Sequence, residues 1–211
     1  MKVTKYEHAC FVVEKDNTSL IVDPGEFTTD FVVPDNVAAI IITHNHADHF
    51  SVENIQEIIK ANPTATVIAP ADVTAKLGQY STKTVTGGDS FAFEGFDLDF
   101  YGDTHALIHL DLPRPMNVGV LVEDRLYYPG DSFVVPDKSV DTLALPISAP
   151  WMKLAESIDF MKAVGARVAF PTHDALLSHI GFSMSDRIIS GFAESYGTMY
   201  KRIDGETITV E

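Results

Sequence analysis

The chain has 211 residues, 45% of them hydrophobic, and this length and composition suit a globular protein with one sizeable core. Its 30 acidic residues outnumber its 15 basic residues, and the net charge of −15 weighs against nucleic-acid binding, because such a surface repels polyanions. No apolar run is long enough to cross a membrane, and a single cysteine excludes an internal disulfide.

The first part of the chain predicts short strands followed by a helix. Runs of apolar and β-branched residues predict strands at residues 2–8, 10–16, 19–25 and 38–43. The last of these is almost entirely apolar, as expected for a strand that is covered on both faces. Residues 51–61 then carry apolar side chains at helical spacing, and Ser51 is a suitable N-cap for that helix.

The rest of the chain continues with strands and adds two more helices. Further strands are predicted at residues 65–70, 83–88, 90–96, 97–103, 140–148, 166–174 and 208–211, with a hairpin over 117–132. Amphipathic helices are predicted at residues 151–165 and 185–197, the first with Trp151 as a core aromatic and Gly165 at its end. Two packed sheets with helices outside accommodate this order, and no linker divides residues 1–211, so we expect a single domain.

The segment Ile40–Phe50, IIITHNHADHF, places four potential metal ligands directly after a buried strand. They are His44, His46, Asp48 and His49. Imidazole nitrogens and carboxylate oxygens are the usual ligands of zinc and related ions, and loops at strand ends commonly carry functional side chains. The alternative is a set of exposed polar residues that cap the helix, but three histidines and an aspartate within six residues favour a metal site.

Three later strand ends offer further ligands. His105 and His109 follow one strand, Asp131 ends the second strand of the hairpin, and His173 follows another strand. Each of these strand ends could face the same end of the sheets. The residues of segment 44–49 alone would not supply enough ligands for two ions.

The segment HNHADH, residues 44–49, resembles the His-x-His-x-Asp-His signature of the metallo-β-lactamase superfamily. The later His105, the Gly130-Asp131 turn and His173 match the order of that family's remaining ligands. The resemblance covers nearly the whole chain. It implies a four-layer αββα sandwich of the α/β (α+β) class, with a dinuclear metal site at the edge between the two sheets.

The resemblance also implies a role for each ligand. The implied sets are His44, His46 and His105 for one ion, Asp48, His49 and His173 for the other, and Asp131 as a bridge between them. The ions would be zinc, with manganese or iron as alternatives. They would share a hydroxide that attacks a carbonyl or phosphoryl centre, and Asp48 could orient it or carry its proton to the leaving group.

Several departures narrow the expected activity. The chain has Asp131 where some β-lactamases use cysteine, so antibiotic hydrolysis is not expected. We expect no room for the inserted domain of nucleic-acid-processing members, and His46 in place of glutamate differs from flavo-diiron proteins. The segment YEHACFVVE resembles the branch that holds L-ascorbate-6-phosphate lactonase-like and other metal-dependent hydrolases.

Four side chains keep alternative roles. His105 is preferred as the third ligand, since a small residue follows it, but His109 could be that ligand, a substrate-binding residue or a residue that orients a ligand. His8 could touch substrate in the metal cleft or be a strand-end histidine bonded to the backbone. Asp23 could fix a turn or orient a ligand histidine through its second nitrogen.

We therefore expect a cytoplasmic enzyme, because no secretory signal is evident, that hydrolyses a small-molecule ester, lactone or phosphoester. The alternatives are a phosphodiesterase or nuclease of the same fold, a non-catalytic metal-binding scaffold, and redox chemistry with iron. The resemblance leaves homo-oligomers open.

Overall fold

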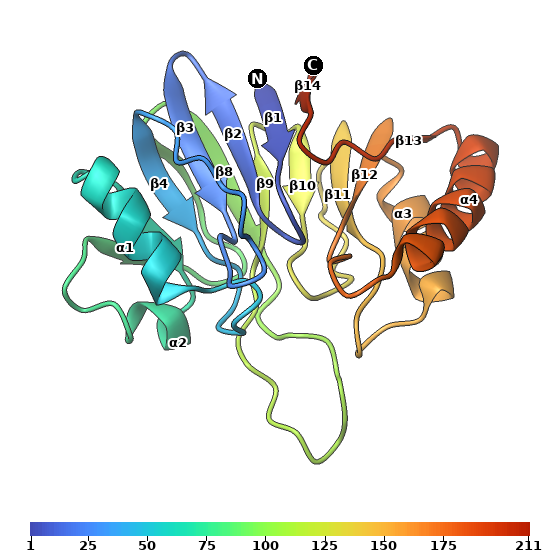
Figure 1. The fold of residues 1–211 in the computed structure, drawn as a ribbon, viewed down its shortest axis with the longest axis horizontal. Helices are drawn as coiled ribbons and strands as arrows, with labels where there is room; N and C mark the ends of the chain where they lie inside the picture. The colour runs from blue at the N-terminus through green and yellow to red at the C-terminus, as the bar shows by residue number, and fades with distance from the viewer.

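Two seven-stranded mixed sheets pack face to face in the computed structural model, which describes residues 1–211 (Figure 1). The first sheet has the spatial order β14 (Thr207–Thr209), β1 (Lys2–Lys5), β2 (Phe11–Lys15), β3 (Thr18–Val22), β4 (Val37–Ile41), β5 (Thr66–Ala69) and β6 (Thr82–Thr84). The second has the order β13 (Met199–Tyr200), β12 (Val168–Thr172), β11 (Thr142–Pro146), β10 (Leu126–Tyr128), β9 (Gly119–Val122), β8 (Phe96–Tyr101) and β7 (Ser90–Phe93).

Helices cover the outer face of each sheet, so the molecule has the four-layer αββα arrangement expected from the sequence. They are α1 (Val52–Ala61), α2 (Ala71–Thr74), α3 (Leu154–Val164) and α4 (His179–Tyr196). One apolar cluster fills the space between the sheets, a second lies under α1 and α2, and a third lies under α3 and α4. None of the four helices combines the length and the apolar sequence that a membrane-spanning helix requires.

The continuous apolar run of β4 is explained by this layering. Ala39 and Ile41 point into the cluster between the sheets, whereas Ile40 and Ile42 point into the cluster under α1. Successive side chains of a strand face opposite sides, and both sides of β4 are covered. The strand therefore needs apolar residues at every position.

The helix boundaries differ from the sequence predictions at two N-termini. The prediction that a helix begins at Trp151 is wrong: α3 begins at Leu154, after Lys153 in extended conformation donates its backbone N–H to Glu156 at 2.6 Å. Trp151 lies in the preceding loop instead. The last helix begins earlier than predicted, because Ser178 caps it and accepts the N–H of Gly181 at 3.3 Å. The short elements α2 and β13 were not predicted.

The predicted N-cap of α1 and the predicted C-terminus of α3 are confirmed. The Ser51 side chain accepts the N–H of Asn54 and caps α1. Gly165 ends α3 with φ at +66°, a left-handed conformation that glycine adopts without a steric penalty.

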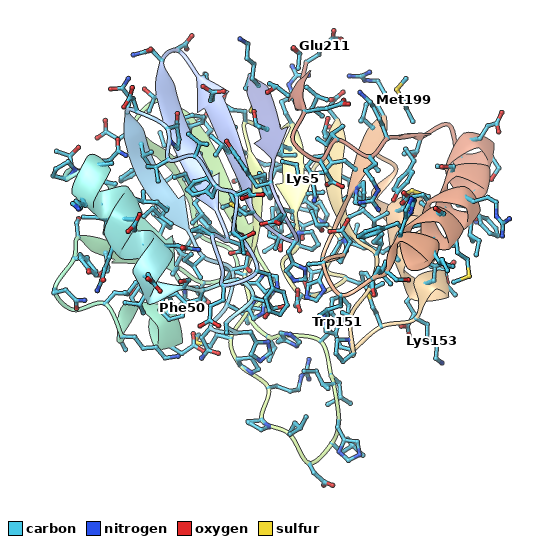
Figure 2. The ribbon with its side chains drawn as sticks, viewed as in Figure 1. Lys5, Phe50, Trp151, Lys153, Met199 and Glu211 are labelled. Carbon is cyan, nitrogen blue, oxygen red and sulfur yellow. The ribbon has the colours of Figure 1, made fainter.

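Parallel pairing brings the carboxyl ends of several strands to one edge of the sandwich. Strand β4 is parallel to β3 and β5, and β11 is parallel to β10 and β12. The sheets also meet at this edge, where the Val118 N–H donates to Thr43 O at 3.0 Å. Phe50 and Trp151 lie here, whereas both chain termini lie at the opposite edge (Figures 1 and 2).

We expect the cluster between the sheets to dominate stability. Phe11 is fully buried there, with its ring 5.4 Å from that of Tyr128 and 6.2 Å from that of Phe170. Phe11→Ala should lower the free energy of unfolding by roughly 3–5 kcal/mol in urea denaturation. Phe192→Ala, at an exposed position of α4, should cost less than about 1 kcal/mol. Equal losses would contradict this placement of the core.

Candidate metal centre

A buried carboxylate holds both ends of the histidine-rich segment. Asp23, after β3, accepts the backbone N–H of Thr43 at 2.8 Å and the Thr43 hydroxyl at 2.6 Å. It also accepts Nδ1–H of His49 at 2.7 Å. The sequence offered this orienting contact as one of two roles for Asp23. The segment between residues 43 and 49 is thereby fixed as a compact loop over the sheet edge.

The structure brings all seven predicted ligands together at this edge. Two groups of four residues each have their ligand atoms within 4.8 Å of one another: His44, His46, His105 and Asp131 form the first, and His8, Asp48, His49 and His173 form the second. A third and smaller group joins Asp23 to His44 and His49. Asp131 lies between the groups. Its Oδ2 is 3.2 Å from His105 Nε2 and 3.0 Å from His173 Nε2, and its Oδ1 is 3.2 Å from His49 Nε2.

Four of the histidines direct the same nitrogen into the centre. In each, Nδ1–H donates to an oxygen outside the centre, which leaves the lone pair of the neutral ring on Nε2. The acceptors are the Asp23 carboxylate for His49, Ala106 O for His105, Ser148 O for His173 and the Thr43 hydroxyl for His44, at 2.7, 2.5, 2.6 and 3.0 Å. In their neutral form these histidines thus present a ligand atom, Nε2, to a cation in the centre.

Four of the inward-facing atoms lack hydrogen-bond partners. Nε2 of His44, His49 and His173 and Oδ1 of Asp131 are buried and unpaired. A buried polar atom without a partner costs about 1–3 kcal/mol, and here lone pairs face carboxylate oxygens. Divalent cations would supply the missing partner to every one of these atoms, so the donor set fits metal ions.

The electrostatics favour positive charge in the centre. Burial alone would lower the pKa of His173, but the Asp131 and Asp48 carboxylates raise it to about 9. Burial also opposes charge on His49, yet Asp131 and Asp23 hold its pKa well above the usual value. Burial would raise the pKa of Asp131, but His49 and His173 keep it well below its usual range. A bound cation would supply the positive charge that these carboxylates favour.

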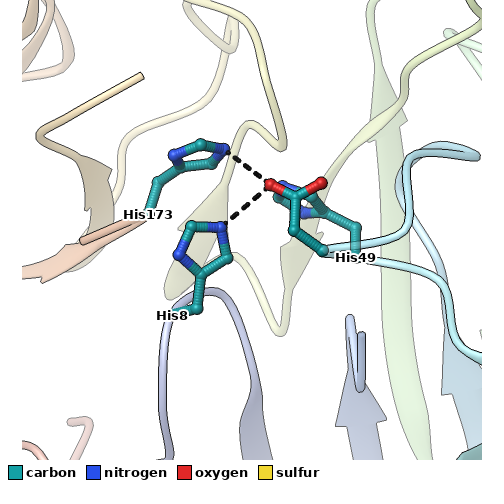
Figure 3. A group of neighbouring side chains, drawn as sticks. His8, His49 and His173 are labelled. Carbon is teal, nitrogen blue, oxygen red and sulfur yellow. Dashed lines mark hydrogen bonds and ion pairs between the residues drawn. The ribbon is translucent and has the colours of Figure 1, made fainter. Parts of the chain in front are cut away.

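His8 has the opposite hydrogen-bonding pattern. Its Nδ1 accepts the backbone N–H of Ala175 at 3.3 Å, so its proton is on Nε2. That N–H donates to Asp48 Oδ2 at 3.1 Å, one of the contacts drawn in Figure 3 beside His49 and His173. His8 is fully buried and lies among the ligand atoms, but it faces the centre as a donor.

The structure gives different surroundings to His105 and His109, the two alternatives for the third ligand. His105 is buried among the ligand atoms, and Arg114 donates twice to its carbonyl oxygen, at 2.7 and 3.0 Å. The His109 side chain is 66% exposed, with Nδ1 3.6 Å from Asp111, and belongs to neither group. The segment between β8 and β9, which contains His109, forms a long loop that extends from the sheet edge (Figure 1).

Two residues at the centre were missed by the sequence analysis. Trp151, expected in a helix core, donates its indole N–H to Asp131 Oδ2 at 2.7 Å. Asn117 accepts the backbone N–H of Asp131 at 2.9 Å and donates to Pro129 O at 3.0 Å, which holds the turn. Gly130 has φ at +61° there, and a Cβ would lie 2.4 Å from the Asn117 side chain. Of these three residues, only Gly130 was indicated by the sequence, through the Gly130-Asp131 turn.

Comparisons with known proteins identify the family and the fold. A family profile described as the Beta-lactamase superfamily domain matches residues 2–173. Protein Rv0786c of Mycobacterium tuberculosis is 36% identical over 183 residues, covering 84% of this chain and 86% of that protein. A UPF0173 metal-dependent hydrolase of Bacillus cereus is 28% identical over 196 residues, covering 82% and 85%. Igni18, a metallo hydrolase of Ignicoccus hospitalis, shares the fold, with a TM-score of 0.76, 17% identity and coverage of 100% and 98%.

The two histidines of the β8–β9 loop provide a matched pair of variants. We expect His105→Ala to weaken metal binding by more than the roughly 10–100-fold that loss of an orienting partner costs, because a ligand atom is removed. His109→Ala should bind metal like the wild type. Metal content by mass spectrometry after dialysis distinguishes them; an empty site in His109→Ala alone would reverse the assignment.

Proposed function

The chain belongs to the metallo-β-lactamase superfamily and is a metal-dependent hydrolase, and from this premise we propose that it cleaves an ester, a lactone or a phosphoester of a small molecule. The observation that carries the proposal is the convergence of unpaired, buried Nε2 and carboxylate oxygen atoms on one edge of the sandwich. The resemblance of the N-terminal segment to the lactonase-like branch favours a lactone within this class.

The proposal includes two divalent cations, with zinc favoured over manganese or iron. Two groups of donors support this number, and Asp131 has atoms close to histidines of both. The proposed sets are His44, His46 and His105 for one ion and Asp48, His49 and His173 for the other, with Asp131 shared. Bound cations of this kind activate water near neutral pH and stabilise developing negative charge.

The two carboxylates differ in exposure, which supports different roles. The Asp131 side chain is 3% exposed, as suits a residue that only binds cations. The Asp48 side chain is 20% exposed and so can reach solvent and substrate. Asp48 is therefore the group that we propose to orient the attacking water and to carry its proton to the leaving group. The His8 N–H holds one oxygen of Asp48 and leaves the other free for that task.

A small substrate is favoured over a polynucleotide. The net charge of −15 repels polyanions over most of the surface. A phosphodiesterase or nuclease of the same fold is the enzymatic alternative, and a non-catalytic metal-binding scaffold is the alternative from another class.

Metal content and activity are measured together to test the proposal. The chain is stripped with a chelator, reloaded with Zn²⁺, Mn²⁺ or Fe²⁺, and assayed on lactones, carboxylic esters, phosphomonoesters and phosphodiesters. We expect about two ions per wild-type chain and turnover of at least one of these classes. Asp131→Asn should lose both together, because the amide keeps the shape of the side chain but removes the charge that faces the cations.

Other outcomes identify the alternatives. Full metal occupancy without turnover across the panel would favour the scaffold. Tight RNA binding with a steep salt dependence would favour the nuclease. A chain that stays empty after reloading would remove the basis of the proposal.

His8 is expected to act through Asp48. His8→Ala should lower metal affinity or kcat roughly 10–100-fold, because Asp48 loses the donor that orients it. His8→Gln should recover much of this loss, since its amide can donate to Asp48 and accept from the Ala175 N–H. Chelator competition and steady-state kinetics measure the two quantities. If the alanine and glutamine variants are equally impaired, the N–H of His8 is not what matters.

A further inference from the structure

Trp151 lies outside the predicted ligand set but contacts its most buried carboxylate. It is the only tryptophan of the chain and is 9% exposed, in the loop between β11 and α3. Its Nε1–H donates to Asp131 Oδ2 at 2.7 Å. An indole nitrogen is a donor only, so the direction of this hydrogen bond is fixed.

This donor differs from the other neighbours of Oδ2. His105 and His173 approach Oδ2 through Nε2, at 3.2 and 3.0 Å, but an imidazole nitrogen gains or loses its proton with pH and with metal binding. Trp151 is thus the neighbour of Oδ2 that donates a proton without titrating. It occupies one acceptor direction of Oδ2, while Oδ1 is buried and unpaired. The hydrogen bond therefore sets which oxygen faces which side of the centre.

The indole is itself held in place by aromatic packing. Its ring centroid is 4.9 Å from that of Phe133, which lies 5.1 Å from that of Phe160 on α3. The same loop supplies Ser148 O, which accepts Nδ1–H of His173. One loop without a proposed ligand thus orients Asp131, from the end of β10, and His173, from the end of β12.

We propose that Trp151 is a positioning residue that fixes the Asp131 carboxylate and thereby sets the metal affinity of the centre. This inference rests on the metal site of the proposed function. It extends that site to the segment PISAPW, residues 146–151, which contains no histidine, cysteine or carboxylate that could bind a metal ion. A packing role alone would be filled by any large aromatic ring at this position.

Trp151→Phe is the direct test, because it keeps an aromatic ring and removes the N–H. We expect its Zn²⁺ affinity, measured by competition with a chromophoric chelator, to fall about 10–100-fold. The absorption spectrum of the Co²⁺-loaded variant should change, since the carboxylate is free to rotate. Phe133→Leu is the control: it weakens the packing around Trp151 but keeps the hydrogen bond, and should bind Zn²⁺ nearly as the wild type does.

A measurement on the wild type keeps the test independent of how well the variant folds. The single tryptophan gives one indole N–H signal in a heteronuclear NMR spectrum. This signal should lie downfield, move on addition of Zn²⁺ with the same saturation curve as metal binding, and shift upfield in Asp131→Ala.

The outcomes separate this inference from the proposed function. The role of Trp151 is overturned, and the metal centre is left intact, if Trp151→Phe binds Zn²⁺ normally. The same holds if the chemical shift of the indole N–H changes neither on addition of Zn²⁺ nor in Asp131→Ala. Absence of Zn²⁺ binding by the wild type overturns both. Weakened binding by Trp151→Phe but not by Phe133→Leu supports the role.

Discussion

The arrangement of the candidate site depends on one constraint: buried nitrogen and oxygen atoms that could bind a cation are held close to one another. Imidazole nitrogens and two carboxylates converge where little water reaches, and the inward atoms of His44, His49 and His173 have no hydrogen-bond partner. Such an arrangement is unfavourable without a cation, and it persists only if the surrounding structure fixes each side chain. The Nδ1 hydrogen bonds to the protein provide this fixation, so a preformed donor set can receive metal with little rearrangement.

Residues from both sheets hold the candidate ligand side chains in place. Close backbone packing also limits the size of the residue that can lie beside the histidine-rich loop. Asp23 holds the histidine-rich loop from β3, while Asn117 and Trp151 hold Asp131 from the second sheet. Gly25 lies so close to the loop that a Cβ would be 2.0 Å from Asp48 O. A larger residue there would displace the backbone of Asp48 and His49, which explains glycine in a turn where its φ is not left-handed.

Hydrogen-bond direction distinguishes ligands from orienting residues where distance does not. His8 and His173 both approach Asp48 Oδ2, at 3.1 and 3.3 Å. The Nδ1 of His173 donates to a carbonyl oxygen, so its neutral ring can offer the Nε2 lone pair to a cation, whereas the Nδ1 of His8 accepts a backbone N–H, so the Nε2 of its neutral ring carries the proton. Proximity alone would have given the second group four ligands; the hydrogen bonds leave three and a donor.

The local sequence pattern by itself determined the positions of most strands and of the candidate site. Apolar runs located most strands because side chains alternate across a sheet, and HNHADH marked the centre because its ligand types are close in sequence. The order of later strand-end residues then gave the remaining partners through the family resemblance. Only the tertiary structure placed His105, and not His109, among the donor atoms, showed the hydrogen bond from His8 to Asp48 and placed Trp151 against Asp131 instead of in a helix core. These outcomes depend on where loops from distant strands meet and on which atom accepts a hydrogen bond, and neither is set by the spacing of residues along the chain.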